Sequence, residues 1–189
     1  MISIISKGWL LKVYLGKIFN MRGLMMSLLL VSMSFVFGQV RNTISVHDKT
    51  FVDRAAQTGI SEVEFGKLAQ EKGEFQFIKT YGFKMEIHHA ELNRELEDLA
   101  ALKNLTFPIE LAQDKQRKLN ELSMKSELDF DNSFIDLMIE EHENAIGLFE
   151  AHLQNGENLD LKKWVEKKLP ALKEHLDEAR EIKNYLQQR

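Results

Sequence analysis

The chain has 189 residues, with 25 basic and 29 acidic side chains and a formal net charge of −4. It contains no cysteine and only two prolines. These counts exclude a disulfide scaffold, a cysteine-ligated zinc or iron–sulfur site, a thiol nucleophile and a proline-rich linker protein. With 44% hydrophobic and 29% charged residues, the composition is typical of a single globular domain.

Residues 1–38 have the pattern of an export signal. They carry four basic residues and no acidic one, and they end in the uncharged run Gly23–Gly38. This run is shorter than the roughly 20 residues of a membrane span, and it matches the apolar part of a secretory signal peptide. We predict that residues 1–38 are removed and that translation begins at Met21, which would make residues 1–20 superfluous. The alternative is an uncleaved anchor, and only then would this segment hold the chain at a membrane.

Removal of the signal would leave 21 basic and 29 acidic residues, a net charge of −8. Nucleic acids require a basic binding surface, so no nucleic-acid partner is expected. We expect an exported, periplasmic protein. An association with the outer membrane and a protein partner in the envelope are left open by the sequence.

After a polar leader over residues 39–47, the sequence from 48 to 189 is helical in pattern throughout. Long helices are predicted over about 48–72, 74–104, 129–154 and 159–187, with a shorter one over about 110–125. No segment alternates β-branched residues with a period of two, so no strand is expected. The sequence therefore predicts an all-α, ferritin-like four-helix bundle with a short extra helix between the second and third long helices.

The ends of these helices follow from a few residues. Gly73, Pro108 and Gly156 are expected to terminate helices, and Pro170 is expected to kink the last one. We predict Asp48 as the N-cap of the first helix, and the third long helix is predicted to begin at one of two further aspartates, Asp129 or Asp131.

Each long helix carries one ionisable residue near the middle of an otherwise apolar or small-residue stripe. These residues are Glu62, His89, His142 and His175. Antiparallel helices of similar length bring their midpoints into one layer, so we expect the four side chains to meet inside the bundle. In the first helix the stripe around Glu62 consists of small residues that let another helix approach closely: Ala55, Gly59, Gly66 and Ala69.

Four segments occur in an order that resembles a known family. They are FVDRAAQTGISEVEFGKLA (51–69), MEIHHAELNREL (85–96), DFDNSFIDLMIEEHENAIGLFE (129–150) and LPALKEHL (169–176). The chain resembles the bacterial domain of unknown function 4142, a family of exported proteins with a ferritin-like four-helix architecture. The resemblance implies a conserved Glu in the first segment and a His in each of the others, at the same four positions named above. The sequence departs from the family pattern at His88, where the family usually has an acidic residue. The resemblance implies no established activity.

Three imidazoles and a carboxylate are suitable ligands for copper, zinc, iron or manganese. The first hypothesis is therefore a non-enzymatic envelope protein that binds a transition metal through these four residues. Met85 and Met138 would favour copper, because a thioether suits Cu(I). Asn93 and Glu141 are predicted to hydrogen-bond to the ligands and orient them.

Two alternatives stay open. In one, the histidines hydrogen-bond to Glu62, to Glu141 or to the backbone and only fix the packing of a structural or protein-interaction bundle. In the other, the protein is a metal-dependent redox enzyme. A standard di-iron centre is not expected, because it needs Glu-x-x-His on two helices and only Glu86–His89 matches. The remaining histidines are interpreted as surface or flanking residues without a role: His47, His88 and His152.

Overall fold

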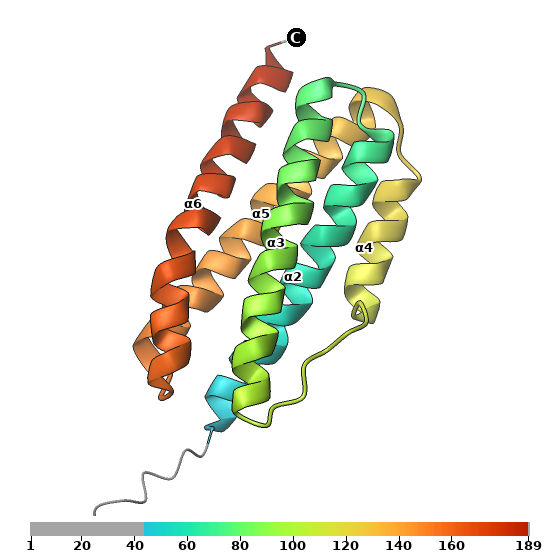
Figure 1. Ribbon diagram of the computed structural model, residues 1–189. Coiled ribbons are helices and arrows are strands. Elements are labelled where there is room, and N and C mark those ends of the chain that lie inside the picture. Colours follow the sequence, from blue (N-terminus) through green and yellow to red (C-terminus); the bar gives the residue numbers. More distant parts are fainter. Residues whose placement is uncertain (1–43, 189) are drawn as a thin grey trace, which may run out of the picture. The chain divides into compact units, whose positions relative to one another are not determined.

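The computed structural model describes residues 44–188. The predictions for residues 1–38 and for most of the polar leader lie outside this part of the chain. Within it the chain forms five helices and no strand (Figure 1), namely α2 (Val46–Lys72), α3 (Gln76–Leu102), α4 (Gln113–Ser123), α5 (Glu127–Asn155) and α6 (Leu159–Gln187). This confirms the predicted all-α bundle of four long helices, with the short helix between the second and the third. Among residues 44–188, no helix has the length and apolar character needed to cross a bilayer.

The helix boundaries lie within three residues of the predicted ones, with Gly73 and Gly156 as C-caps, but both predicted N-caps are wrong. The N-cap of α2 is Ser45 rather than Asp48, and the Asp48 backbone N–H donates to Ser45 Oγ (3.0 Å). The Asp48 carboxylate in turn accepts from the Ser45 backbone N–H (3.4 Å), which completes a capping box one turn earlier than predicted. Helix α5 begins after Ser126, ahead of both predicted aspartate caps. Helix α6 continues through Pro170.

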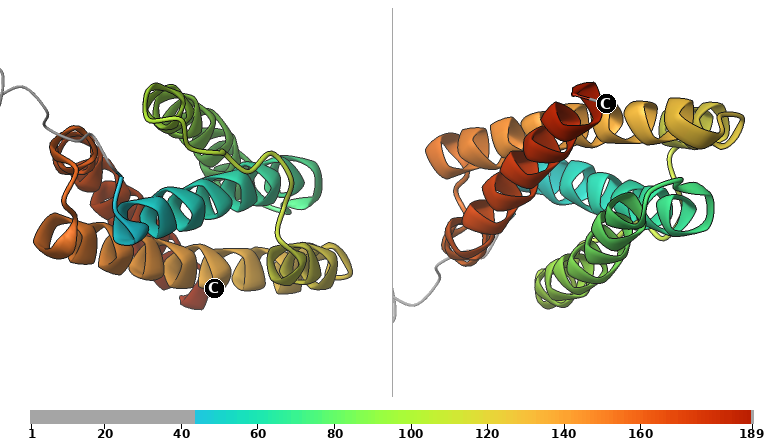
Figure 2. Two further views of the ribbon diagram at one scale, coloured as in Figure 1. Left: turned by 90° about the horizontal axis from the view of Figure 1, so that it is seen from below. Right: turned by 90° about the horizontal axis from the view of Figure 1, so that it is seen from above.

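The long helices form two hairpins, α2 with α3 and α5 with α6, which pack on each other mainly through α2 and α5. Figure 2 shows this arrangement along the helices, with α4 against α2 and α5. The small residues of α2 permit its close contact with α3. A Cβ on Gly66 would overlap Gly82 O and would lie 2.9 Å from the backbone nitrogen of Glu86. The predicted role of this small-residue stripe is therefore confirmed at Gly66.

The apolar core consists of two clusters, one toward each end of the bundle. One contains Phe51, Leu96, Phe149 and Val165, and the other contains Phe65, Tyr81, Phe134 and Ala179. Along every long helix, the ionisable residue of the stripe lies between members of the two clusters. A polar layer therefore divides the core, and it contains Glu62, His89, His142 and His175.

Two buried aspartates hold the loops at the ends of the hairpins. Asp131 of α5 accepts the backbone N–H groups of Glu74 (2.9 Å) and Phe75 (3.1 Å), at the start of α3. Asp48 of α2 accepts those of Glu157 (3.1 Å) and Asn158 (3.4 Å), between α5 and α6. Backbone donors that would otherwise lack partners at helix starts are thus satisfied by carboxylates from neighbouring helices. This explains why Asp131 does not cap its own helix.

Candidate metal centre

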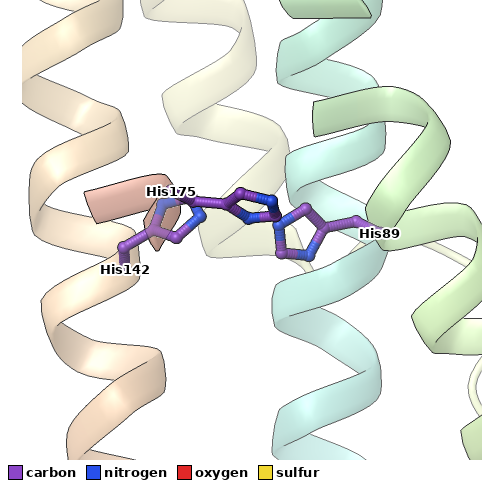
Figure 3. Close-up of side chains that lie close together, drawn as sticks. All are labelled: His89, His142 and His175. Carbon is purple, nitrogen blue, oxygen red and sulfur yellow. The ribbon is translucent and has the colours of Figure 1, made fainter. Parts of the chain in front are cut away.

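The polar layer brings together four side chains from four helices. Glu62 of α2 and His142 of α5 are completely buried, while His89 of α3 is 1% exposed and His175 of α6 is 3% exposed. One ring nitrogen from each histidine lies within 4.8 Å of the other two, and Figure 3 shows the rings converging from three helices. The centroids of each pair of these rings are 5.4 Å apart.

One nitrogen of each ring is already engaged. His142 Nδ1 donates to the backbone oxygen of Met138, one turn earlier in α5 (2.8 Å). His89 Nδ1 lies 2.7 Å from Glu62 Oε2. His175 Nε2 lies 2.9 Å from His88 Nδ1, so one of these two nitrogens donates a hydrogen bond to the other. The backbone carbonyl and the carboxylate can only accept, so His142 and His89 carry their protons on Nδ1.

The other nitrogen of each ring has no partner. Within residues 44–188, eight buried side-chain nitrogen and oxygen atoms lack a hydrogen-bond partner, and five of them belong to this layer. They are His89 Nε2, His142 Nε2, His175 Nδ1 and both oxygens of Glu62. Buried polar groups normally find partners, and an unpaired one costs about 1–3 kcal/mol. Glu62 Oε2 still has its close contact with His89 Nδ1 (2.7 Å), whereas the three ring nitrogens leave the layer with buried atoms that a bound ion could satisfy.

The electrostatics of the layer favour a bound cation. Burial opposes the ionisation of Glu62, but the facing His89, His142 and His175 outweigh it and lower the pKa of the carboxyl to about 2. Burial lowers the pKa of His142, although Glu62 opposes the shift. Burial, together with the other histidines, lowers the pKa of His175 to about 2. The layer thus holds Glu62 as a carboxylate and keeps His142 and His175 neutral at pH 7, and carboxylates and neutral imidazoles are the forms that bind metal ions.

Glu62 lies beside the three histidines, but the group whose ligand atoms lie within 4.8 Å of one another contains only His89, His142 and His175 among the described residues, so Glu62 as a fourth ligand stays a prediction. Its oxygens are nearest to Nδ1 of His89 (2.7 Å) and Nδ1 of His142 (3.4 Å), whereas the unpartnered nitrogens of these rings are Nε2. A carboxylate in this position orients the imidazole and increases its basicity, as in carboxylate–histidine–metal triads.

The four residues predicted to support the ligands lie in different surroundings. Glu141 is buried but turns to α4, where it pairs with Lys115 and Lys118. Asn93 lies over Gly59, where a Cβ would be 2.9 Å from its amide nitrogen. Met85 and Met138 are fully buried in the apolar cluster around Phe65. Of the four, Met138 has a contact with the histidines, through its backbone oxygen.

Two histidines interpreted as surface residues have roles that the sequence analysis missed. His88 is exposed yet reaches His175, and the interpretation of His152 as a surface residue is wrong because it is completely buried. Adjacent residues on a helix point about 100° apart. This places His88 outside the stripe of His89, but α6 packs close enough for His175 to meet it. Tyr81 holds α6 in this position by donating to the His175 backbone oxygen (3.0 Å).

An all-α bundle whose core is divided by a buried layer of histidines and a carboxylate defines the class of this protein. Residues 39–182 match the family model "Domain of unknown function (DUF4142)", and the chain belongs to this family. The resemblance found in the sequence is thereby confirmed.

The structural comparison supports the same fold. The chain is similar to the crystal structure of a DUF305 fragment from Deinococcus radiodurans, with a TM-score of 0.65 at 12% sequence identity over 77% of this chain and 99% of that one. At this identity the likeness concerns the fold alone. No curated protein matches the sequence.

Proposed function

We propose that this protein binds one transition metal ion in the polar layer, through His89 Nε2, His142 Nε2 and His175 Nδ1. The observation that carries the proposal is that these three buried nitrogens lack partners in residues 44–188 while the opposite nitrogen of each ring is held in place. A hydrogen bond in which one ring nitrogen donates leaves the electron pair of the other available to a metal, and for His175 this requires Nε2 to donate to His88 Nδ1.

Glu62 supplies the negative charge and orients His89. A divalent ion bound to three neutral imidazoles keeps its full charge, and burying that charge is unfavourable without a counterion. Glu62 is ionised and completely buried, so it provides this counterion inside the layer. We expect Glu62→Gln to retain the fold and to weaken metal binding about 10–100-fold.

The donor set favours copper(II) or zinc over softer ions. Imidazole suits zinc, copper, iron and nickel, whereas a thioether would be needed to favour Cu(I). Met85 and Met138 pack among apolar side chains of one cluster, together with Phe65 and Ile135. In this proposal the methionines fill the core and do not select the metal.

A structural bundle is the second candidate, and a specific observation favours it. The contacts of His142 with Met138 O, of His89 with Glu62 and of His175 with His88 would fix the packing of four helices even without a metal. A metal-dependent redox enzyme is a third candidate, and the single Glu-x-x-His match gives it less support. Export to the periplasm, with an envelope protein as partner, is part of the proposal through the signal-like segment 1–38.

Elemental analysis of the untagged protein, purified from cells expressing the full chain, tests the first candidate against the second. We expect bound copper or zinc, and we expect His142→Ala to lose one equivalent per chain. Met138→Leu is the matched control, because it lies one turn away in the same core and retains the backbone oxygen that holds His142. Equal metal content in wild type and His142→Ala would refute the proposed ligands and leave the structural bundle.

A further inference from the structure

A second histidine–aspartate group lies where α2 begins and α5 ends. His152, in the last turn of α5, is completely buried. One face of its ring stacks on Phe51, with centroids 3.9 Å apart and an interplanar angle of 21°. Gly156 closes another side, because a Cβ there would lie 2.6 Å from His152 Cε1. The ring is therefore held firmly in one orientation.

Packing alone does not explain a histidine at this position. Neither Nδ1 nor Nε2 of His152 has a hydrogen-bond partner within residues 44–188. A phenyl ring would fill the same space without leaving two buried nitrogens unpaired, each at a cost of about 1–3 kcal/mol. Outside the central layer and Asn93, His152 is the remaining source of such unpartnered atoms in this part of the chain. In either tautomer of a neutral His152, one of these nitrogens carries an electron pair that a bound cation would satisfy.

Two further metal-ligating side chains face this imidazole. Asp48 Oδ1 lies 3.7 Å from His152 Nε2, and the ring of His47 stacks on that of His152 with centroids 5.6 Å apart. One ligand atom from each of the three residues lies within 4.8 Å of the other two. His47 is exposed, so the group opens to solvent on that side.

The protonation states suit a cation. Burial lowers the pKa of His152 to about 4, aided by His47 and Lys162 and opposed by Asp48, so the imidazole is neutral at pH 7. The pKa of Asp48 is lowered as well, because hydrogen bonds from Ser45, Asn158 and Glu157 outweigh the effect of burial. An ionised carboxylate has about four lone-pair positions. Asp48 accepts two hydrogen bonds on each oxygen, and the longer one on Oδ1, from the Asn158 backbone N–H (3.4 Å), is the contact that a metal ion beside His152 would replace.

We propose that His47, Asp48 and His152 form a second metal site, which binds a divalent ion of the zinc class at the solvent-facing end of the bundle. Two imidazoles and one carboxylate are an established ligand set for zinc, with the remaining positions open to water or to another ligand. The site shares no residue with the polar layer. Evidence against either site therefore leaves the proposal for the other site unaffected.

Zinc titration of the untagged full chain, stripped of metal with a chelator, tests this site by calorimetry with parallel elemental analysis. We expect wild type to bind two equivalents of Zn²⁺. His47→Ala should bind one equivalent, or bind the second at least tenfold more weakly, because an exposed ligand is lost while the fold is untouched. Lys49→Ala, an exposed neighbour on α2 that is not a ligand, should retain both equivalents.

The central site is distinguished by a second variant. His142→Ala should remove one equivalent and leave the His47-dependent one, and the double variant should bind none. If His47→Ala binds as many equivalents as wild type with unchanged affinity, the second site is refuted whatever happens at His142. If only His142→Ala changes the titration, the central proposal survives alone; if only His47→Ala does, the new site survives alone.

Discussion

Glu62 and Asp131 are both completely buried carboxylates, but their surroundings are opposite. Asp131 accepts two backbone N–H groups at the start of α3, and Asp48 does the same for the loop before α6. Glu62 faces three histidines, and within the described chain neither of its oxygens receives an aligned hydrogen bond. Burial alone does not separate a structural carboxylate from a binding one. The donors around it do, because a carboxylate that the fold has left unsatisfied favours a cation.

The polar layer around Glu62 and the loop contacts of Asp131 should differ most in their response to metal. A ligand that binds only the folded state at a thousand times its dissociation constant stabilises it by about 4 kcal/mol. For a chain of this size this corresponds to a rise in melting temperature of about 8–16 °C. We expect this rise with copper(II) or zinc in thermal unfolding of the wild type.

The contribution of the polar layer to this rise is lost in variants of its histidines. His89→Ala, His142→Ala and His175→Ala should each remove it, whereas Met138→Leu should retain it. A rise of the same size in all three histidine variants would place the effect elsewhere in the molecule.

The pH dependence of the metal-free protein is the next largest effect. His175 and His152 have lowered pKa values in the folded state, about 2 and about 4, against an ordinary value of 6.5. Between pH 6.5 and these values the unfolded chain binds more protons than the folded one, so stability falls as the pH falls. Each pH unit below 6.5 should remove about 1.4 kcal/mol for a buried histidine such as His175.

Chemical denaturation between pH 7 and 4.5, in the presence of a chelator, measures this loss. His152→Leu should lessen the slope, since one of the two strongly shifted groups is gone. An unfolding free energy that stays constant between pH 6.5 and 4.5 would contradict the prediction that His175 and His152 are buried and neutral.

The third test of the comparison between Glu62 and Asp131 removes the charge of each carboxylate by substitution. Asp131→Ala leaves the N–H groups of Glu74 and Phe75 without their carboxylate, and we expect it to destabilise the protein by about 2–4 kcal/mol. Glu62→Gln in the metal-free protein should destabilise it less than Asp131→Ala, because the amide keeps the size of the side chain and an oxygen beside His89 Nδ1 and loses only the stability that accompanies the lowered pKa of Glu62. Urea unfolding of both variants with a chelator present makes the measurement. Equal destabilisation would show that Glu62 is as structural as Asp131.

The periodicity of the sequence was sufficient to predict the helices and the residues that the polar layer contains. An ionisable residue in the middle of an apolar stripe must face the core, and helices of similar length bring their midpoints together. The same reasoning could not predict the orientation of each side chain within the layer. That Glu62 lies behind the Nδ1 atoms of His89 and His142 depends on how closely α2 approaches its neighbours.

Contacts between helices also explain why the environments of Glu141 and His152 were not predicted. Glu141 adjoins His142 in sequence but faces α4, where two lysines pair with it. His152 appeared to be a flanking residue because it lies in the last turn of its helix, yet the first turn of α2 packs over it through Phe51. The sequence of one helix carries no information on which neighbour covers its ends. Only the assembled bundle shows these contacts.

The last comparison concerns two helical glycines that differ in what surrounds them. A Cβ on Gly66 would lie against the backbone of α3, at Gly82 and Glu86, whereas around a Cβ on Gly147 there is nothing within 4 Å. Gly147→Ala should stabilise the protein by about 0.5–1 kcal/mol, because alanine favours the helix and meets no obstacle. Gly66→Ala should destabilise it by about 1–3 kcal/mol, because α2 and α3 must separate.

The same pair of variants connects helix spacing to the metal centre. Glu62 lies one turn from Gly66 on α2, and its 2.7 Å approach to His89 of α3 depends on the distance between these two helices. Gly66→Ala should therefore weaken metal binding in the polar layer as well as stability, while Gly147→Ala should leave binding unchanged. Calorimetric titration of both variants with zinc tests this coupling. Unchanged affinity in a folded Gly66→Ala protein would show that the orientation of His89 does not depend on the contact between α2 and α3.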